Sequence, residues 1–142
     1  MAPTCADIIS ETESWLKTPY QHQASLKGVG CDCLGLVRGV YCAVYGKEPE
    51  PVPAYTPDWA EASGEETLAT AALRHLRPVA LDAIKPGHVL LFRWRSGLPA
   101  KHAAILVEQA RFVHAHDGAA VSYASLTSWW QRRLAYAFAF ST

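Results

Sequence analysis

Cys33 is the residue with the clearest capacity for chemistry in this sequence. It lies where a glycine-rich loop meets an apolar segment, within the stretch GVGCDCLGLVRGVYCAVY that spans residues 28–45. The apolar segment has its large side chains three or four residues apart, which predicts a helix with one buried face. These side chains are Leu34, Val37, Tyr41 and Val44. Gly46 is typical of the position that ends such a helix.

A thiol at a helix N-terminus lies beside unpaired backbone amides and the positive end of the helix dipole. Both features favour the thiolate over the thiol, and the thiolate is the nucleophilic form of cysteine. Such a nucleophile needs a base to hold its proton and a third group to orient that base, usually from elements distant in the sequence. The histidines further along the chain are therefore the candidates for the base and the orienting group.

His102 is the candidate base. It opens an apolar strand, where a residue with only a packing role would be aliphatic, and it follows a Gly/Pro/Lys loop suited to the rim of a cleft. A solvated surface histidine is the alternative interpretation, because isolated histidines often have no catalytic role.

His114 and His116 are the candidates for the third group, and they share one face of the next strand because side chains alternate with period 2. Their relation to His102 depends on the strand register. A hairpin centred on Glu108 places His114 directly across from His102. A two-residue turn at Gln109–Ala110 instead moves His114 to the opposite face. The pattern leaves the two histidines equivalent, and solvation at the strand end is a further alternative.

The elements that must position these residues are helices first and strands afterwards. A helix is expected over residues 5–17, with Thr4 as its cap, and another within residues 60–76, from about Glu65. Four prolines between residues 48 and 59 exclude regular helix there and suggest an extended surface crossing.

After Pro86 and Gly87 the apolar period changes to that of strands. Strands are expected at residues 89–94, 103–107, 112–115, 119–123 and 134–140, with a helical turn at 127–132. In the last strand the large side chains share one face and alanines the other; the large ones are Leu134, Tyr136, Phe138 and Phe140. This order favours a single α+β domain over residues 1–142 with a mainly antiparallel sheet.

The composition excludes several classes of function. Thirteen basic and thirteen acidic residues give no net charge, so no overall field draws the chain to nucleic acid or to an anionic membrane. No run approaches the roughly 20 apolar residues that insert into a bilayer, and the N-terminus is unlike a secretory signal. We therefore expect synthesis in the cytoplasm, as a soluble protein with reduced cysteines.

Four separated motifs resemble, in the same order, those of the NlpC-type cell-wall peptidases, papain-like cysteine enzymes that cut peptidoglycan stem peptides. The motifs are TPYQHQASLKGVGCDCLGLV, PGHVLLF, KHAAILV and FVHA. The resemblance covers most of the chain from Thr18 onward. It implies the papain-like NlpC-type fold, with N-terminal helices packed on the sheet, the nucleophile at a helix N-terminus, and no cofactor or metal.

The resemblance also implies roles for individual residues. Cys33 would be the nucleophile, His102 the base and His114 the orienting group, with His116 as the alternative third residue. Together with the helix end, a charged His102 is expected to lower the pKa of the thiol to roughly 3.5 to 7.5.

Two further residues match the family's first motif. Tyr20 matches a tyrosine whose hydroxyl helps to hold the oxyanion, and Asp32 matches an aspartate that shapes the loop or meets a substrate amine. The chain departs from the family at Leu34, where serine is usual, and at His88, where aspartate is usual. The first change is expected to alter subsite polarity and the second to affect only a turn.

Within the family, the chain looks most like the signal-less peptidases of phage tails and gene-transfer-agent particles. That resemblance implies partners at a tail tip or baseplate, action at the cell wall or periplasm of a target cell, and cleavage between D-glutamate and the diamino acid. The alternatives are a structural tail-tip protein with little activity, a cell-wall amidase, or a zinc-binding domain. The zinc site would use Cys31, Cys33 and strand histidines, although Cys-x-Cys is not the common ligand spacing.

Overall fold

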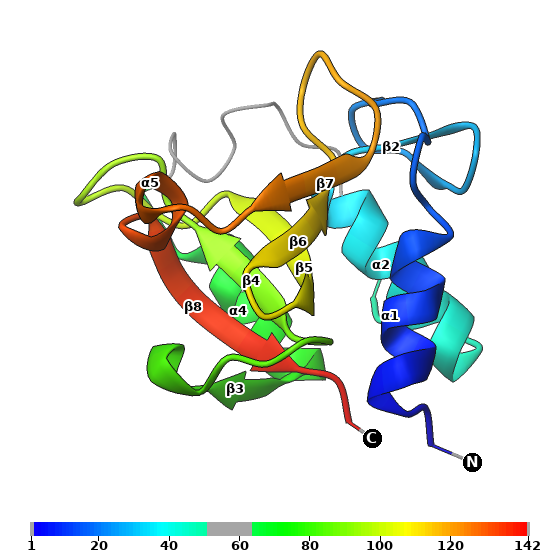
Figure 1. The fold of residues 1–142 in the computed structure, drawn as a ribbon, viewed down its shortest axis with the longest axis horizontal. Coiled ribbons are helices and arrows are strands. Elements are labelled where there is room, and N and C mark those ends of the chain that lie inside the picture. The colour runs from blue at the N-terminus through cyan, green and yellow to red at the C-terminus, as the bar shows by residue number, and fades with distance from the viewer. Residues whose placement is uncertain (1, 51–63, 142) are drawn as a thin grey trace.

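The computed structural model describes residues 2–50 and 64–141, and a six-stranded antiparallel sheet is the centre of that part of the chain (Figure 1). The helices are α1 (Cys5–Glu13), α2 (Cys33–Tyr45), α4 (Thr67–His75) and α5 (Ser128–Gln131), with a short 3-10 helix, η1, at Leu81–Ala83. The strands of the large sheet, in spatial order, are β3 (Arg77–Val79), β8 (Leu134–Ala139), β4 (Val89–Phe92), β5 (His102–Glu108), β6 (Arg111–His114) and β7 (Ser122–Ser125). β1 (Ser25–Leu26) and β2 (Gly30–Cys31) form a separate pair just before α2. The expected α+β class with an antiparallel sheet is confirmed.

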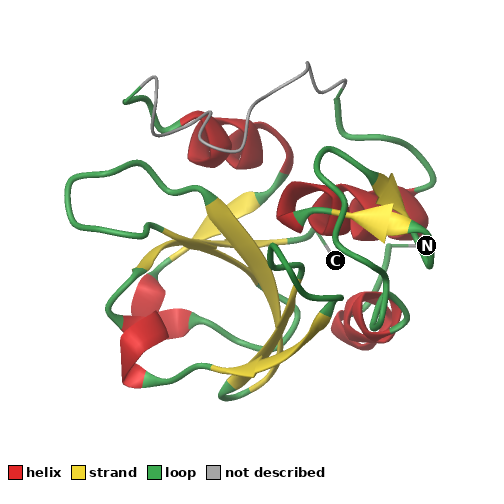
Figure 2. Cartoon of the chain, turned by 90° about the horizontal axis from the view of Figure 1, so that it is seen from above, coloured by secondary structure: helices red, strands yellow, loops and turns green. Residues whose placement is uncertain are grey.

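Each face of the sheet carries its own hydrophobic core. Helices α1, α2 and α4 cover one face, and α5 lies on the opposite side (Figure 2). Odd-numbered residues of β4 and β5 pack toward the first three helices, whereas even-numbered residues pack toward α5. Leu91 and Ile105 represent the first set, and Leu90 and Leu106 the second. The central strand β4 is therefore apolar at every position, as is usual for a strand covered on both faces.

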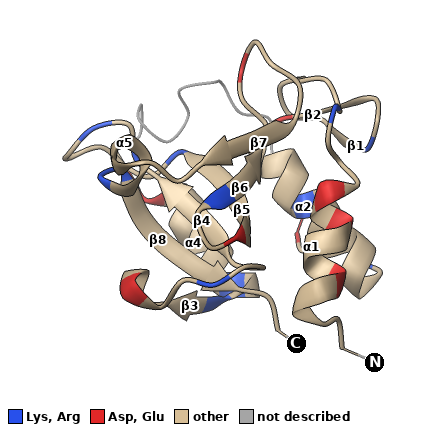
Figure 3. Ribbon diagram, in the orientation of Figure 1, with Lys and Arg blue, Asp and Glu red and all other residues tan. Residues whose placement is uncertain are grey.

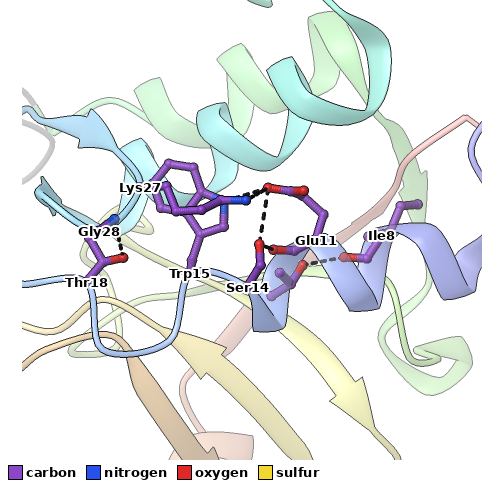
Figure 4. A network of polar contacts seen from close by, with 8 residues as sticks. Ile8, Glu11, Ser14, Trp15, Thr18, Lys27 and Gly28 are labelled. Atoms are coloured by element: carbon purple, nitrogen blue, oxygen red, sulfur yellow. Dashed lines mark hydrogen bonds and ion pairs between the residues drawn. The ribbon is translucent and has the colours of Figure 1, made fainter.

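Polar contacts with the end of α1 fix the segment that leads to α2 (Figure 4). Glu11 is the centre of these contacts: its Oε2 accepts the indole N–H of Trp15 at 3.0 Å and pairs with the Lys27 ammonium at 2.6 Å. The backbone N–H of Gly28 donates to the hydroxyl of Thr18 at 3.0 Å. Both ends of the loop are thus held near α1, and the loop delivers the chain to the start of α2.

The first helix is shorter than the sequence predicts. Thr4 is its N-cap and forms a capping box with Asp7, which confirms the expected start. The predicted end at residue 17 is wrong, because α1 stops at Glu13 and turns follow. Lys17 has a φ of 73°, and its N–H donates to the Val121 carbonyl at 2.9 Å. The chain leaves the helix there to meet the segment that follows β6.

Several strand boundaries also differ from the pattern. β4 ends at Phe92 instead of residue 94, and β7 begins at Ser122 instead of residue 119. In β8, Leu134 packs against the core opposite to that of Tyr136, so these two do not share a face as predicted. The reason is an extra residue in β8, since Leu91 pairs with Tyr136 but Phe92 pairs with Leu134.

The described surface is mixed in charge. Figure 3 shows acidic residues on α1 and basic residues on β3 and around α5. No helix within residues 2–50 and 64–141 is long and apolar enough to cross a bilayer. Most of the proline-rich stretch between residues 48 and 59 lies outside the described residues.

Candidate active site

Cys33 is the first residue of α2, and Asp32 is the N-cap that starts this helix. One carboxylate oxygen of Asp32 accepts the N–H of Gly35 at 2.7 Å, and the other accepts the N–H of Gln23 at 2.8 Å. Asp32 therefore ties the helix start to the preceding loop, as predicted for a residue that shapes this loop. Gly46 ends the helix in the left-handed region with a φ of 77°, also as predicted.

The loop before α2 packs so closely that only glycine fits at residue 35. A Cβ on Gly35 would lie 1.8 Å from the carbonyl oxygen of Ala24. Ala24 is itself fixed, because its carbonyl accepts the N–H of Asp32 at 3.2 Å. Ser25 adds a further contact, donating its hydroxyl to the Gly35 carbonyl at 2.6 Å. The position of the thiol is thus set by contacts within a short span of sequence.

The buried face of α2 is not the one that the spacing predicts. Leu36 and Val40 are 0% exposed and face the core between the helices and the sheet. The predicted set, Leu34, Val37, Tyr41 and Val44, is only half-buried and flanks that core. Gly39 lies against the ring of Trp15, where a Cβ would be 2.1 Å from the indole, so this glycine lets the turn after α1 approach the helix on the Leu36 side.

β5 and β6 form a hairpin whose turn is Gln109–Ala110, since Glu108 pairs with Arg111. The alternative hairpin centred on Glu108 is therefore wrong. By itself the two-residue turn places His114 on the face of the sheet opposite to His102.

A bulge beside the turn reverses that outcome. The register shifts by one residue after Leu106, which pairs with Phe112. Continued toward the far end of the strands, this register puts Ala104, not His102, across from His114. His102 and His114 consequently lie on one face as diagonal neighbours, not directly opposite each other as predicted.

The rings of His102 and His114 are in direct contact. Nε2 of His102 lies 2.9 Å from Nδ1 of His114, and the two residues are 5% and 6% exposed. If Nδ1 of His102 is to accept a proton, its Nε2 must carry the hydrogen and donate it to His114, whose own hydrogen then lies on Nε2. His116 is exposed, with its ring centroid 5.8 Å from that of His102. The structure thus places His114, not His116, where a group orienting His102 must be.

Indole rings pack around His102 on the side of α5. The ring of Trp94 lies 5.2 Å from His102 between centroids at an interplanar angle of 28°, and that of Trp130 lies 5.7 Å away at 29°. Trp94 follows β4 and Trp130 belongs to α5. These rings restrict the tilt of the imidazole and keep water from its faces.

One pocket, of about 310 Å³, contains both the thiol and the candidate base. It is lined by Tyr20, His22, Asp32, Cys33, Leu34, Trp94, Lys101, His102, Ala115, His116 and Asp117. The thiol of Cys33 donates to the backbone carbonyl of Lys101 at 3.7 Å, and Lys101 directly precedes His102. Among the predicted site residues, His114 is the one outside this lining, since it is buried behind the pocket.

Burial keeps both reacting groups neutral in the unliganded protein. It raises the pKa of the Cys33 thiol to about 12, with the Asp32 carboxylate adding to the shift and nearby backbone amides opposing it. It lowers the pKa of His102 well below 6.5 and that of His114 to about 4. The predicted lowered thiol pKa and charged His102 are therefore wrong for the resting site, because desolvation outweighs the helix end.

Tyr20 reaches the pocket from the segment beside β2, where it forms a bridge with Cys31. Burial raises the pKa of its phenol to about 12, and the Asp32 carboxylate adds to this shift. The hydroxyl therefore keeps its proton at neutral pH and can donate a hydrogen bond to a developing oxyanion.

Among the described residues, the fold brings together a different group of possible metal ligands from the zinc site predicted from the sequence. Ring nitrogens of His102, His114 and His116 all lie within 4.8 Å of one another, but neither cysteine belongs to this group. Cys31 is 0% exposed and packs in the core with α1 and α2. The predicted zinc site that combines Cys31 with the histidines is therefore wrong.

The two departures from the family pattern have different surroundings. Leu34 lines the thiol pocket and also a second, apolar pocket of about 320 Å³ between α2 and α4. His88 lies in a turn, where its Nδ1 accepts the N–H of Lys85 at 3.0 Å. As predicted, His88 acts on a turn and takes no part in the thiol pocket.

Apart from Ala115, four pocket residues were not predicted: His22, Trp94, Lys101 and Asp117. Trp94 had a signal, because it follows Phe92 by two residues and Phe92 pairs with His102. His22 lies within the first quoted motif, two residues after Tyr20. The other two lie at loop positions, and only the path of the folded chain shows that they reach the pocket.

Comparison with known proteins finds relatives of this chain by sequence and by fold. Over 136 residues the chain is 31% identical to the gamma-DL-glutamyl hydrolase of Bacillus subtilis (strain 168), a match that covers 89% of this chain and 28% of that protein. The chain thus spans less than a third of the length of this relative. The fold also matches the crystal structure of the NlpC/p60 domain of the peptidoglycan hydrolase SagA, with a TM-score of 0.71 at 21% identity. This match covers 97% of this chain and all of that chain.

A second solved structure shows the same fold. The match to an NlpC/P60 family protein from Bacillus cereus ATCC 10987 has a TM-score of 0.70 at 19% identity and covers 96% of this chain and 40% of that one. The model of the NlpC/P60 family matches residues 17–138, which include every residue assigned to the pocket. The chain therefore belongs to the NlpC/P60 family.

Proposed function

We propose that this protein is a cysteine peptidase that hydrolyses peptidoglycan stem peptides at the bond between D-glutamate and the diamino acid. The observation that carries the proposal is the pocket shared by Cys33 and His102, with His102 bonded to the buried His114. Membership of the NlpC/P60 family supports the same class of reaction. One similar protein is named a gamma-DL-glutamyl hydrolase, and another is a peptidoglycan hydrolase.

In this mechanism, Nδ1 of His102 takes the proton of the Cys33 thiol as the sulfur attacks the amide carbonyl carbon. The carbonyl oxygen becomes an oxyanion, which the backbone N–H of Cys33 and the Tyr20 hydroxyl stabilise. The C–N bond then breaks, and His102 returns the proton to the leaving amine. Water, deprotonated by His102, hydrolyses the thioester, releases the new carboxylate and restores the thiol.

Because the thiol and the imidazole are both neutral at rest, the ion pair forms only during the reaction. His114 stabilises it by accepting the Nε2 hydrogen of His102, which keeps Nδ1 directed to the pocket. The Trp94 and Trp130 rings beside His102 favour the charged imidazolium once it has formed, through contact with their π-faces.

The bond specificity is the finer part of the proposal. Asp32 lines the pocket while its carboxylate also accepts two backbone N–H groups, so its charge is fixed in place beside the thiol. A fixed carboxylate suits the free amine of a stem peptide whose sugar has been removed. Leu34 makes the neighbouring wall apolar where serine is usual, which bears on how the stem is held.

Defined muropeptides, incubated with the purified protein and analysed by mass spectrometry, test the proposal. Release of a product ending in L-Ala-D-Glu supports the endopeptidase. Release of whole stems from the lactyl group would make the protein an amidase. Absence of both products would favour a structural role. Cys33→Ser is the control for a contaminating hydrolase.

We further propose that the protein works within a phage tail or gene-transfer-agent particle, with tail-tip or baseplate proteins as its partners. This rests on the resemblance of residues 28–41, GVGCDCLGLVRGVY, to the tail-associated members of the family. Such a location would bring the site to the cell wall of a target cell. Copurification with tail components is the expected result, and recovery only as a free protein outside particles would contradict it.

A further inference from the structure

The three histidines near the thiol pocket form a compact group of nitrogen ligands. One ring nitrogen from each of His102, His114 and His116 lies within 4.8 Å of the other two. The first two are held rigidly on β5 and β6 by burial, while His116 is exposed and lines the pocket. A metal ion that enters from the pocket can therefore meet two buried ligands and one exposed ligand.

The spacing and chemistry of this group suit a zinc ion. Zinc binds imidazole nitrogen at about 2.0 to 2.1 Å, so two ligand atoms of a tetrahedral site lie about 3.3 Å apart. Nε2 of His102 and Nδ1 of His114 are 2.9 Å apart, so this pair needs only a small ring movement. The nitrogen of His116 lies within 4.8 Å of theirs and has to come closer for the ion to be held by all three rings. The three side-chain ligands of the group are all imidazoles, which argues against calcium and magnesium because these ions prefer oxygen ligands.

The same group includes the base that the proposed hydrolysis requires. His102 must be free to take the thiol proton and to donate a hydrogen bond to His114. A metal ion on this pair replaces that hydrogen bond and fixes both rings as ligands. Metal binding and proton transfer therefore exclude each other.

We propose that His102, His114 and His116 form a zinc site whose occupancy reversibly inhibits the enzyme, with water in the fourth position on the side of the pocket. The inhibition rests on the proposed hydrolysis, whereas the binding site itself does not. His116 then has a role separate from the catalytic pair, since it completes the metal site.

Metal binding is measured first, without reference to activity. The full chain is stripped with EDTA, dialysed, and titrated with zinc chloride in competition with a chromophoric chelator. We expect one zinc ion per chain, and affinity at least about tenfold lower in His116→Ala, a loss of about 1.4 kcal/mol. His22→Ala, which removes a histidine that lines the same pocket outside the group, and Cys31→Ser should bind zinc as the wild type does.

Thermal unfolding of each variant confirms that the fold is retained. Equal zinc affinity in the wild type and His116→Ala overturns the site, and so does loss of binding in Cys31→Ser. His102→Ala and His114→Ala should also weaken binding, because each removes one of the three ligands.

Inhibition is then measured against the metal-free rate of each protein. Zinc should inhibit the wild type over the concentration range of its binding, EDTA should restore the rate, and His116→Ala should need at least about ten times more zinc. Equal sensitivity of the two proteins would overturn the inhibitory role and indicate zinc on the thiol instead. If the metal-free protein cleaves no stem peptide, the proposed function fails while the binding titration still decides the site.

Discussion

The two halves of the active site are built in different ways. The thiol half is held by neighbours in sequence: Asp32 caps the helix, and Gly35 packs on the Ala24 carbonyl. The histidine half is assembled from distant segments, since His102 contacts His114 across a hairpin and the indole of Trp130 from α5. Because its contacts are local, the thiol half can be predicted from the sequence, whereas the histidine half depends on strand register.

Besides the shared hydrophobic core, hydrogen bonds join the two halves within the described residues. The Cys33 thiol contacts the Lys101 carbonyl just before β5. The segment after β6 is tied to the first loop, because the N–H of Val121 donates to the Thr18 carbonyl at 2.8 Å. The following variants each change one half and test how far the other half depends on it.

The largest effect is expected for Cys33→Ser, which should lower hydrolysis by roughly 10³-fold or more, because a hydroxyl is far harder to ionise than a thiol. Its free energy of unfolding should change by less than about 1 kcal/mol, since the volume is almost unchanged. Stem-peptide cleavage and thermal unfolding are measured together. Cys42→Ser, half-buried on the same helix, is the matched control, and loss of activity in Cys31→Ser alone would place the nucleophile at Cys31.

Next in size are the histidine variants. His102→Ala should lower kcat by about 10²- to 10⁴-fold, because it removes the general base. His114→Ala should be strongly impaired through loss of the correct tautomer, and His116→Ala only mildly affected. Values of kcat and KM for the three metal-free variants test this order. If His114→Ala and His116→Ala exchange places, the assigned hydrogen-bond partner of His102 is wrong.

Stability should fall as the pH drops from about 6.5 toward 4. Burial lowers the pKa of His114 to about 4 and also lowers that of His102, with His116 facing both rings. Between the folded and unfolded pKa values the unfolded chain binds more protons, so acid favours unfolding. The loss from His114 alone is at most about 3 kcal/mol. The free energy of unfolding, measured with urea between pH 7 and pH 5, should change less steeply with pH for His114→Asn than for the wild type. An identical pH dependence in the two proteins would contradict this account.

The smallest effect tests the thiol half alone. Gly35→Ala should destabilise the protein by about 1 to 3 kcal/mol, because the new Cβ meets the Ala24 carbonyl. Helix propensity by itself predicts the reverse, a gain of about 1 kcal/mol. The exposed Ala43 on the same helix offers the control, since Ala43→Gly should lose about that amount. Chemical denaturation of both variants gives the comparison, and a stabilised Gly35→Ala would refute the close packing of the loop.

The sequence by itself determined the local features of this protein. The Asp32–Cys33 pair after a glycine-rich loop predicted the helix start, and Gly46 predicted its end. Period-2 patterning predicted most strands, and four ordered motifs indicated the family. These features depend on residues close together in the chain, and local backbone preference largely decides them.

Tertiary structure decided the rest. The bulge after Leu106 placed His114 on the face of His102, and no alternation pattern reveals a one-residue shift. Close approach of the Trp15 ring, in the turn after α1, to Gly39 selected the buried face of α2. Burial, which only the assembled fold provides, reversed the expected pKa of Cys33. Register, packing and desolvation all arise from contacts between distant segments, and for that reason the residue pattern alone could not fix them.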